Sequence, residues 1–466
     1  MNFAELRFWE FLFGALTVIL VVRYLCAHLA RSALATFDKI ALFSLGLFLL
    51  LCVSWVTFLI FLAVAITTYV GLAWILKYHA KHGSKYLFVL IPLQILPLVY
   101  YKYGDFFVNR VMGFNVDAFR NLVIPVGISF YTFQKVAFVI DTLALKSPLP
   151  RFLDYLNFAG FFPQIVAGPI ERKANLLPQM EKFRFRWLPE KINEGAGWIV
   201  VGLFFKCCLA DNLAGYFNGS SRTNPYLIWK ANLIFGLRIY YDFAGYSLVA
   251  VGLACCLGIS LTLNFRSPYC STSLAEFWRR WHITLSGWFR DYVYIPMGGG
   301  RVKWWAFNIA VVFIVSGAWH GAGWNFILWG ALHGLFLIAN RLGGKLNVPR
   351  LLAWGLTMVG SFYAWLSFYE LRTDVLLQKS KVLLMPSAYN GEALHEAIRG
   401  LASGDGIALG GFLLLTALTL LVEWLSVTDK NEEYYYFRQP LALGVLVALT
   451  LLLAPGKTNA FIYFAF

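Results

Sequence analysis

The chain has 466 residues, of which 59% are hydrophobic and only 14% charged, and its mean hydropathy is +0.65. A soluble globular chain carries about 25% charged residues, so this composition excludes a soluble protein and predicts a polytopic membrane protein. The net charge of +15 comes from Lys and Arg in short loops between apolar runs, as the positive-inside rule predicts, and does not indicate nucleic-acid binding.

Three apolar runs open the chain, at residues 6–24, 40–76 and 86–101. A helix that crosses a bilayer needs about 20 apolar residues, so the first run predicts a retained membrane helix rather than a removed signal peptide. The second run is long enough for two helices, with a break near Ser54 and Trp55. In the third run, Pro92 and Pro97 predict an interruption of the helix.

Polar residues, among them Lys135 and Asp141, interrupt the next apolar run, 123–145. Such residues are tolerated at membrane depth where they line protein or water, so this run predicts a bent or re-entrant segment. Run 152–169 is expected to be a short half-span. The loop that follows, 172–191, is the most basic of the chain and is expected on the cytoplasmic side.

The second half of the chain holds seven further apolar runs. They are residues 195–217, 227–263, 304–319, 324–340, 351–369, 407–427 and 441–455. Together the runs predict about 11 transmembrane helices, with an amphipathic loop at 370–405. Since no internal repeat and no soluble domain is visible, the sequence predicts one all-α integral membrane domain over 1–466.

The most polar long element is the stretch 273–300, SLAEFWRRWHITLSGWFRDYVYIPMGGG. Wound as a helix, it carries a cationic stripe and an opposite aromatic stripe. The cationic stripe is Arg279, His282, Ser286 and Arg290; the aromatic one is Phe277, Trp281, Leu285, Trp288 and Tyr292. Ser273 and Glu276 predict a capping box at its start. We expect this amphipathic helix at the membrane surface or inside a protein-lined cavity.

A second histidine, His320, lies between Trp319 and Gly321 in a run without Asp, Glu, Lys or Arg from Ala306 to His333. An ionisable residue inside a membrane is a functional candidate, and desolvation favours the neutral imidazole that acts as a general base. The alternative is a neutral histidine that serves only helix packing. Neighbouring glycines favour a site slightly, because they let a substrate or another backbone approach closely.

The other candidates each have two interpretations. His282 is either solvated or a second proton handler. Arg279, Arg280 and Arg290 either bind the phosphate of an acyl donor or anchor the helix to the headgroups of membrane lipid.

Asp242 lies four residues after Arg238, at the spacing of a helical ion pair; alternatively, it lines a cavity with Tyr240. The seven cysteines lack the spacing of a metal site, so the sequence predicts no structural metal.

Four motifs together resemble one family. They are FPQIVAGPIER, YYDFAGYS, FWRRWHITLSGWFRDYVYIPMGG and WHGAGWNFILWGALHG, and the closing FIYFAF is similar too. The chain is identified as a member of the membrane-bound O-acyltransferase family, in the bacterial branch that contains the alginate O-acetyltransferase membrane component. The resemblance covers a core of about 90–340, followed by helices over 351–466. His320 corresponds to the family's active-site histidine and His282 to its second polar position.

The resemblance implies helices around a central channel in the inner membrane of a bacterium. Candidates to line the channel are Tyr240, Asp242, Trp319 and Asn325, and Asn325 or His282 is a candidate oxyanion donor. The donor would be acetyl-CoA or another cytoplasmic thioester, with no tightly bound cofactor. A periplasmic acetyltransferase partner within a polysaccharide synthesis and secretion complex would complete O-acetylation of an alginate- or cellulose-like exopolysaccharide. The alternatives are D-alanyl transfer to teichoic acid and a glycan or lipid transporter.

Overall fold

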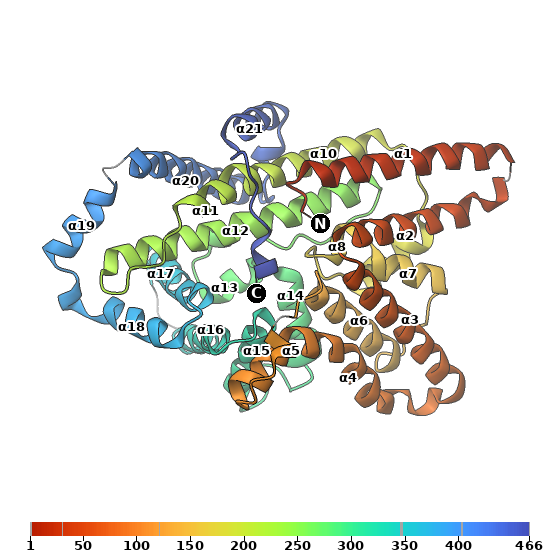
Figure 1. The fold of residues 1–466 in the computed structure, drawn as a ribbon, viewed down its shortest axis with the longest axis horizontal. Helices are drawn as coiled ribbons and strands as arrows, with labels where there is room; N and C mark the ends of the chain where they lie inside the picture. Colours follow the sequence, from red (N-terminus) through yellow and green to blue (C-terminus); the bar gives the residue numbers. More distant parts are fainter. Residues whose placement is uncertain (1, 30, 121, 345–347, 402–403, 466) are drawn as a thin grey trace. The chain divides into compact units, whose positions relative to one another are not determined.

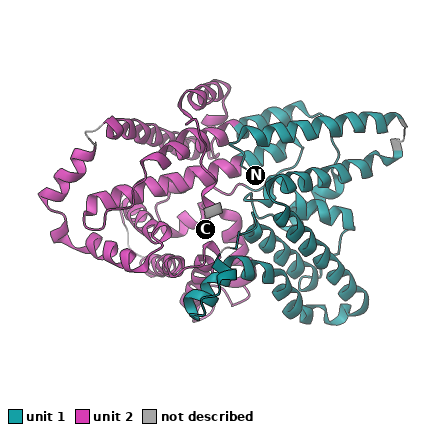
Figure 2. Cartoon of the chain, viewed as in Figure 1, with its two compact units in different colours: residues 1–199, 249–262 teal, residues 200–248, 263–466 magenta. Residues whose placement is uncertain are grey.

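The computed structural model describes every residue except 1, 30, 121, 345–347, 402–403 and 466. The predicted loop 370–405 and the closing motif FIYFAF, residues 461–466, each contain some of these residues, which lie outside the described part. All regular elements of the described residues are helices, which confirms the all-α prediction (Figure 1). The chain divides into unit 1, residues 1–199 and 249–262, and unit 2, residues 200–248 and 263–466 (Figure 2).

The helices of unit 1 lie largely in the first 200 residues. They are α1 (Leu6–Leu29), α2 (Leu34–Val53), α3 (Trp55–Tyr78), α4 (Leu87–Leu98), α5 (Asp117–Arg120), α6 (Ile128–Leu143), α7 (Phe152–Gly160), α8 (Phe162–Ile165), α9 (Lys173–Lys182) and most of α10 (Pro189–Leu203). Those of unit 2 are α11 (Asp211–Tyr216), most of α12 (Pro225–Cys256), α13 (Leu274–Arg280), α14 (Ile283–Phe289), α15 (Trp305–His320), α16 (Trp324–Leu342), α17 (Arg350–Tyr369), α18 (Thr373–Leu384), α19 (Gly391–Leu401), α20 (Gly404–Lys430) and α21 (Pro440–Leu453).

Eight helices of the described residues are long and apolar enough to cross a membrane. They are Leu6–His28, Leu34–Val53, Trp55–Tyr78, Ala80–Tyr103, Pro189–Tyr216, Pro225–Cys256, Arg350–Tyr369 and Gly404–Lys430. Two shorter apolar helices are Trp305–His320 and Pro440–Leu453. The chain is therefore a multi-pass membrane protein. The difference from the predicted count of about 11 lies in runs 304–319, 324–340 and 441–455, whose helices α15, α16 and α21 are not among the eight.

The break predicted in run 40–76 is confirmed at Ser54, which separates α2 from α3. Ser54 has an extended backbone (φ −167°), and its side chain accepts a hydrogen bond from the Thr57 N–H, so it caps α3. The interruption predicted at Pro92 and Pro97 is wrong, because both prolines lie inside α4. Membrane helices tolerate proline because neighbouring groups satisfy the freed carbonyls.

Three further segments contain helices too short to cross a membrane. In run 123–145 an irregular segment ends at Gly127, whose backbone is left-handed (φ 74°), and helix α6 follows, in which Lys135 is fully buried; the bend expected in this run lies at that turn. Run 152–169, the predicted half-span, holds the two short helices α7 and α8, of nine and four residues. The predicted loop at 370–405 instead contains the helices α18 and α19.

Helices α15 and α16 form the most closely packed pair within unit 2. A Cβ atom at Gly330 would lie 2.1 Å from the carbonyl oxygen of Phe313, and one at Gly317 would lie 2.2 Å from that of Phe326. The glycines therefore let two backbones approach each other, which is one of the two roles that the sequence left open for the glycines near His320.

Gly330→Ala is expected to destabilise the protein by about 1–3 kcal/mol, because the added methyl group forces the two helices apart. The control is Gly355→Ala in α17, where a Cβ atom meets no atom within 4 Å. That change should leave stability unchanged or raise it by about 1 kcal/mol. The melting temperatures of the purified proteins in detergent measure both effects, and equal melting temperatures would contradict the packing argument.

Candidate active site around two buried histidines

The helix predicted over 273–300 is divided at Trp281 and His282. Helix α13 ends at Arg280 and α14 begins at Ile283, and His282 between them has a left-handed backbone (φ 42°, ψ 54°). The single amphipathic helix is therefore a wrong prediction. His282 is only 1% exposed, so it is buried inside the protein and not solvated.

Of the two hydrogen bonds of the predicted capping box, the one accepted by the Ser273 side chain is confirmed. The Ser273 Oγ accepts a hydrogen bond from the Glu276 N–H at 3.1 Å. The Glu276 carboxylate reaches back to the N–H of Thr272 at 2.9 Å, one residue before the position expected. Burial raises the pKa of Glu276, but the hydrogen bonds from Thr272 and the Arg280 guanidinium outweigh it, so this pKa lies below its ordinary value.

The left-handed turn at His282 is held by Asn264. The Ile283 N–H donates to the Asn264 carbonyl oxygen at 2.9 Å, and the Thr284 hydroxyl donates to the Asn264 Oδ1 at 2.6 Å. A non-glycine residue in this backbone region costs of order 1–3 kcal/mol and persists only where its surroundings enforce it. Asn264 supplies that enforcement, since it replaces the helical hydrogen bonds that the break removes.

The same asparagine selects the tautomer of His282. The Thr284 N–H points at the Asn264 Oδ1 at 3.3 Å, which requires an oxygen at that position. The Nδ1 of His282 lies 3.3 Å from this oxygen. Because a carbonyl oxygen only accepts, a hydrogen bond here needs the proton on Nδ1, and the lone pair of the neutral imidazole is then on Nε2.

His282 and His320 share one aromatic enclosure within unit 2. The His282 ring lies 4.7 Å from that of Phe243, which lies 4.5 Å from that of Tyr463, which in turn lies 5.7 Å from the His320 ring. On the other side, the Trp319 ring lies 5.0 Å from His320 and 6.0 Å from His282. These five rings form one aromatic cluster. Phe243 and Tyr463 connect the two histidines on one side, and Trp319 connects them on the other.

Two further rings complete the surroundings of His320, which is 2% exposed. Trp329 of α16 and Phe368 of α17 meet it edge to face at 4.8 and 5.3 Å. Trp329 also contacts His333, whose Nδ1 accepts a hydrogen bond from Trp278 at 3.3 Å. Helices α15, α16 and α17 thus converge on His320.

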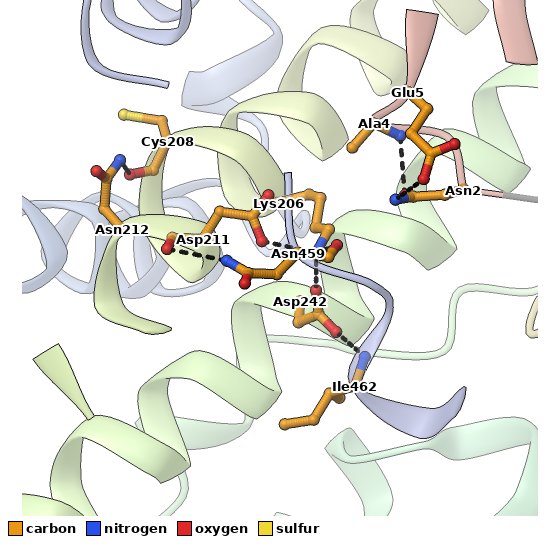
Figure 3. A network of polar contacts seen from close by, with 10 residues as sticks. All are labelled: Asn2, Ala4, Glu5, Lys206, Cys208, Asp211, Asn212, Asp242, Asn459 and Ile462. Atoms are coloured by element: carbon orange, nitrogen blue, oxygen red, sulfur yellow. Dashed lines mark hydrogen bonds and ion pairs between the residues drawn. The ribbon is translucent and has the colours of Figure 1, made fainter. Parts of the chain in front are cut away.

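Asp242 of α12 does not form the predicted pair with Arg238; its partner is Lys206 (Figure 3). The Lys206 Nζ lies 2.6 Å from Asp242 and 2.7 Å from Asp211, and all three side chains are buried. Lys206 lies in a π-helical turn, Phe204–Ala210, and a Cβ atom at Gly245 would lie 2.8 Å from its backbone nitrogen. Because α12 lies so close to the backbone of Lys206 at Gly245, the Lys206 side chain reaches Asp242, although Lys206 is farther from Asp242 in the sequence than Arg238 is.

The remaining predicted residues are dispersed over unit 2. Tyr240 is fully buried, and its hydroxyl donates to Glu423 of α20 at 2.6 Å. The Asn325 amide donates to the Ser367 carbonyl oxygen at 3.1 Å and joins α16 to the end of α17. Neither Tyr240 nor Asn325 belongs to the aromatic cluster of five rings.

The three arginines have different surroundings. Arg279 is exposed, while Arg280 pairs with Glu276 at 3.0 Å. Arg290 pairs with Asp291 at 2.7 Å and lines a cavity of about 240 Å³ bordered by α13, α14 and α15. Ser286 and Ser316 line the same cavity, four residues after His282 and four residues before His320.

Sequence reasoning did not single out Asn264, Lys206 or Tyr463. Lys206 had a usable signal, since a lysine within the apolar run 195–217 requires a buried counter-charge. Tyr463 had none beyond its place in the closing FIYFAF, and Asn264, which lies between two of the motifs, had none. Among the described residues, no three His, Cys, Asp or Glu side chains gather as a metal would require.

Comparison with known proteins identifies relatives of the whole central region. A model of the membrane-bound O-acyltransferase family matches residues 40–364. The chain is 34% identical over 364 residues to the peptidoglycan O-acetyltransferase of Helicobacter pylori, covering 68% of each chain. It is 34% identical over 304 residues to the probable alginate O-acetylase AlgI of Pseudomonas aeruginosa, covering 62% of this chain and 58% of the relative. It is 30% identical over 292 residues to the teichoic acid D-alanyltransferase of Bacillus subtilis, covering 58% and 72%.

Lys206→Met is expected to destabilise the protein by about 3–5 kcal/mol, because it leaves two buried carboxylates without their counter-ion. Lys191→Met is the control, since Lys191 pairs with Glu194 on the surface, and it should cost under about 1 kcal/mol. Thermal denaturation in detergent compares the two. Equal melting temperatures for both variants would contradict the ionic role of Lys206.

Proposed function

The chain belongs to the membrane-bound O-acyltransferase family, and we propose that it transfers an acetyl group from a cytoplasmic thioester to a hydroxyl group of a cell-envelope polysaccharide. The observation that carries this proposal is the enclosure of His320 and His282 by one set of aromatic rings. A dry, rigid site with two imidazoles suits proton transfer during acyl exchange. The proposal includes residence in the inner membrane of a bacterium.

The chemistry requires one proton to be taken up and one to be returned. The acceptor oxygen attacks the carbonyl carbon of the thioester while its proton passes to His320. The carbon–sulfur bond then breaks, and the thiolate leaves with the proton that His320 returns. The electron pair of the broken bond stays on sulfur, so no oxidant or reductant is needed.

The negative charge that develops on the carbonyl oxygen needs a hydrogen-bond donor. In the tautomer that Asn264 favours, His282 offers a lone pair at Nε2, which suits a second proton acceptor better than an oxyanion donor. The Asn325 amide already donates to Ser367. Trp329 offers another donor, because its buried indole N–H has no hydrogen-bond partner among the described residues and its ring contacts His320.

The cavity lined by Arg290 supports a thioester donor that carries phosphate. Its other lining is mainly apolar and aromatic, with the two serines Ser286 and Ser316. A guanidinium at an apolar cavity suits a phosphate-bearing carrier with a flexible arm, such as acetyl-CoA. We propose acetyl-CoA as a transient substrate and no tightly bound cofactor.

The acceptor is proposed as an exopolysaccharide of the alginate or cellulose type, reached through a periplasmic acetyltransferase partner in a synthesis and secretion complex. The names of two relatives, a probable alginate O-acetylase and a peptidoglycan O-acetyltransferase, support a carbohydrate acceptor. D-alanyl transfer to teichoic acid is supported less, since that relative is 30% rather than 34% identical. Membership of an acyltransferase family argues against a transporter.

His320→Ala should lower the O-acetyl content of the host's envelope polysaccharides at least 100-fold, because loss of a general base costs about 10²–10⁴ in rate. Exopolysaccharide and peptidoglycan are isolated separately and their alkali-labile acetate is measured. His395→Ala is the control, since His395 is exposed on α19. Membrane levels of each variant are checked by immunoblot.

The fraction that loses acetate identifies the acceptor. Acetate that persists in both fractions would contradict the role of His320, and loss of ester-linked D-alanine instead would favour teichoic acid. Disappearance of the polymer itself from the cell surface would favour a transporter.

Arg290→Gln should raise the KM for acetyl-CoA about tenfold with a smaller effect on kcat, because one charge-assisted hydrogen bond is lost. The assay follows [14C]acetyl-CoA into ester-linked products in inverted membrane vesicles that retain the cell's own acceptor. Arg372→Gln is the control, because Arg372 is exposed and pairs with Asp374. An unchanged KM would exclude Arg290 from donor binding.

A further inference from the structure

We propose that a cavity between α17 and α20 of unit 2 binds one anionic phospholipid, with the lipid phosphate at Arg350 and an acyl chain along the two helices. The cavity has a volume of about 830 Å³, and ligand sites typically measure about 300–1,000 Å³. His282 and His320 are not among its described lining residues. The lipid site is therefore separate from the chemistry proposed above.

Two membrane-spanning helices form the walls of the cavity. On α17 the lining residues run from Arg350 to Phe362, and on α20 they run from Leu413 to Trp424. At 1.5 Å per residue, each wall is about 17 Å long. Both helices are among the eight that are long and apolar enough to cross a membrane. The cavity thus follows about three turns of two spanning helices, which suits an extended hydrocarbon chain.

The cavity has a buried side and an exposed side. Leu237 of α12 and Thr416 of α20 are 4% and 1% exposed, whereas Leu351 and Trp354 of α17 are 78% and 42% exposed. The Thr416 hydroxyl donates to the Phe412 carbonyl oxygen at 2.7 Å, so the buried side needs no polar group from a ligand. Because exposed apolar residues of a spanning helix contact lipid, a phospholipid reaches this cavity without leaving the bilayer.

Arg350 places a positive charge at one end of the cavity. It begins α17 and is exposed, and among the described lining residues it carries the only charge. Trp354, one turn later, donates its indole N–H to the Tyr269 carbonyl oxygen at 2.9 Å. Arg and Trp side chains at the end of a membrane helix are typical of the level of the lipid headgroups. Basic pockets between membrane helices bind anionic headgroups, so this end matches a phosphate and the apolar length matches an acyl chain.

The cavity also borders the segment that follows Asn264. Tyr269 lines the cavity, and its ring stacks at 5.1 Å on Phe362, another lining residue. The Tyr269 hydroxyl donates to the Gly236 carbonyl oxygen of α12. A bound acyl chain packs against both rings and binds only the folded protein, so the lipid should raise the melting temperature of the protein.

The test titrates the purified full-length protein in detergent with phosphatidylglycerol or with phosphatidylethanolamine of the same acyl chains. Native mass spectrometry gives the affinity for the first bound lipid. Phosphatidylglycerol should bind at least about fivefold more tightly, because its headgroup carries a net negative charge and one nearby cation has an effect of this size. It should also raise the melting temperature more than phosphatidylethanolamine does. Equal affinities would overturn the proposal of an anionic lipid.

Arg350→Gln tests the headgroup end and should reduce the preference for phosphatidylglycerol to below twofold. Arg372→Gln is the control, because Arg372 is exposed and pairs with Asp374. The control should keep the full preference. If Arg350→Gln keeps it too, the anionic headgroup does not bind at Arg350 and the proposal is overturned.

Ala417→Trp tests the acyl-chain end, since it places an indole ring in the cavity between Leu413 and Trp424. It should lower the affinity for phosphatidylglycerol at least fivefold. Ala408→Trp is the matched control on the same helix, because Ala408 is exposed and is not among the described lining residues. Equal affinities in these two variants would overturn the acyl-chain site. If Ala417→Trp does not fold, the two arginine variants decide the proposal.

Discussion

Unit 2 depends on the neutralisation of one buried cation. Lys206 is 3% exposed and contacts two carboxylates, Asp242 and Asp211, that are equally buried. Taking such charges out of water costs several kcal/mol for each ion, and only close pairing with additional hydrogen bonds offsets that cost. The close approach of α12 at Gly245 allows the close pairing. The additional hydrogen bonds come from segment 459–462, whose Asn459 carbonyl oxygen accepts from Lys206 and whose Ile462 N–H donates to Asp242. Charge neutralisation thereby joins three parts of the chain that are distant in sequence.

Two different devices orient the two histidines. His282 is held by a strained left-handed backbone and by the hydrogen bonds of Asn264. His320 ends α15 and is held by rings from α16, α17 and the segment after α21. Each set of contacts fixes its imidazole before any substrate arrives, which is the arrangement that the proposed proton transfer needs. The aromatic content of 18% is explained in part by this enclosure.

The break between α13 and α14 shows how tertiary contacts override local helical preference. Residues 273–289 have the periodicity of one amphipathic helix, and Ser273 caps its start as the pattern predicts. A continuous helix would leave the backbone of Asn264 without the partner that it has in Ile283. Hydrogen bonding to Asn264 and Arg266, together with burial of Phe277 and Trp281, outweighs the helical hydrogen bonds lost at the break.

The sequence by itself determined the membrane class, the helical fold, the break at Ser54 and the two histidines, because these follow from local hydropathy, capping chemistry and motifs. It also gave the family by resemblance. Only the tertiary structure decided that Asp242 pairs with Lys206 rather than Arg238, that His282 is buried at a left-handed turn, and that Tyr463 reaches His320. Each of these depends on contacts between residues far apart in the chain. Local periodicity carries no information about which distant group will pair with a buried charge, hydrogen-bond to a broken helix or pack against a buried ring.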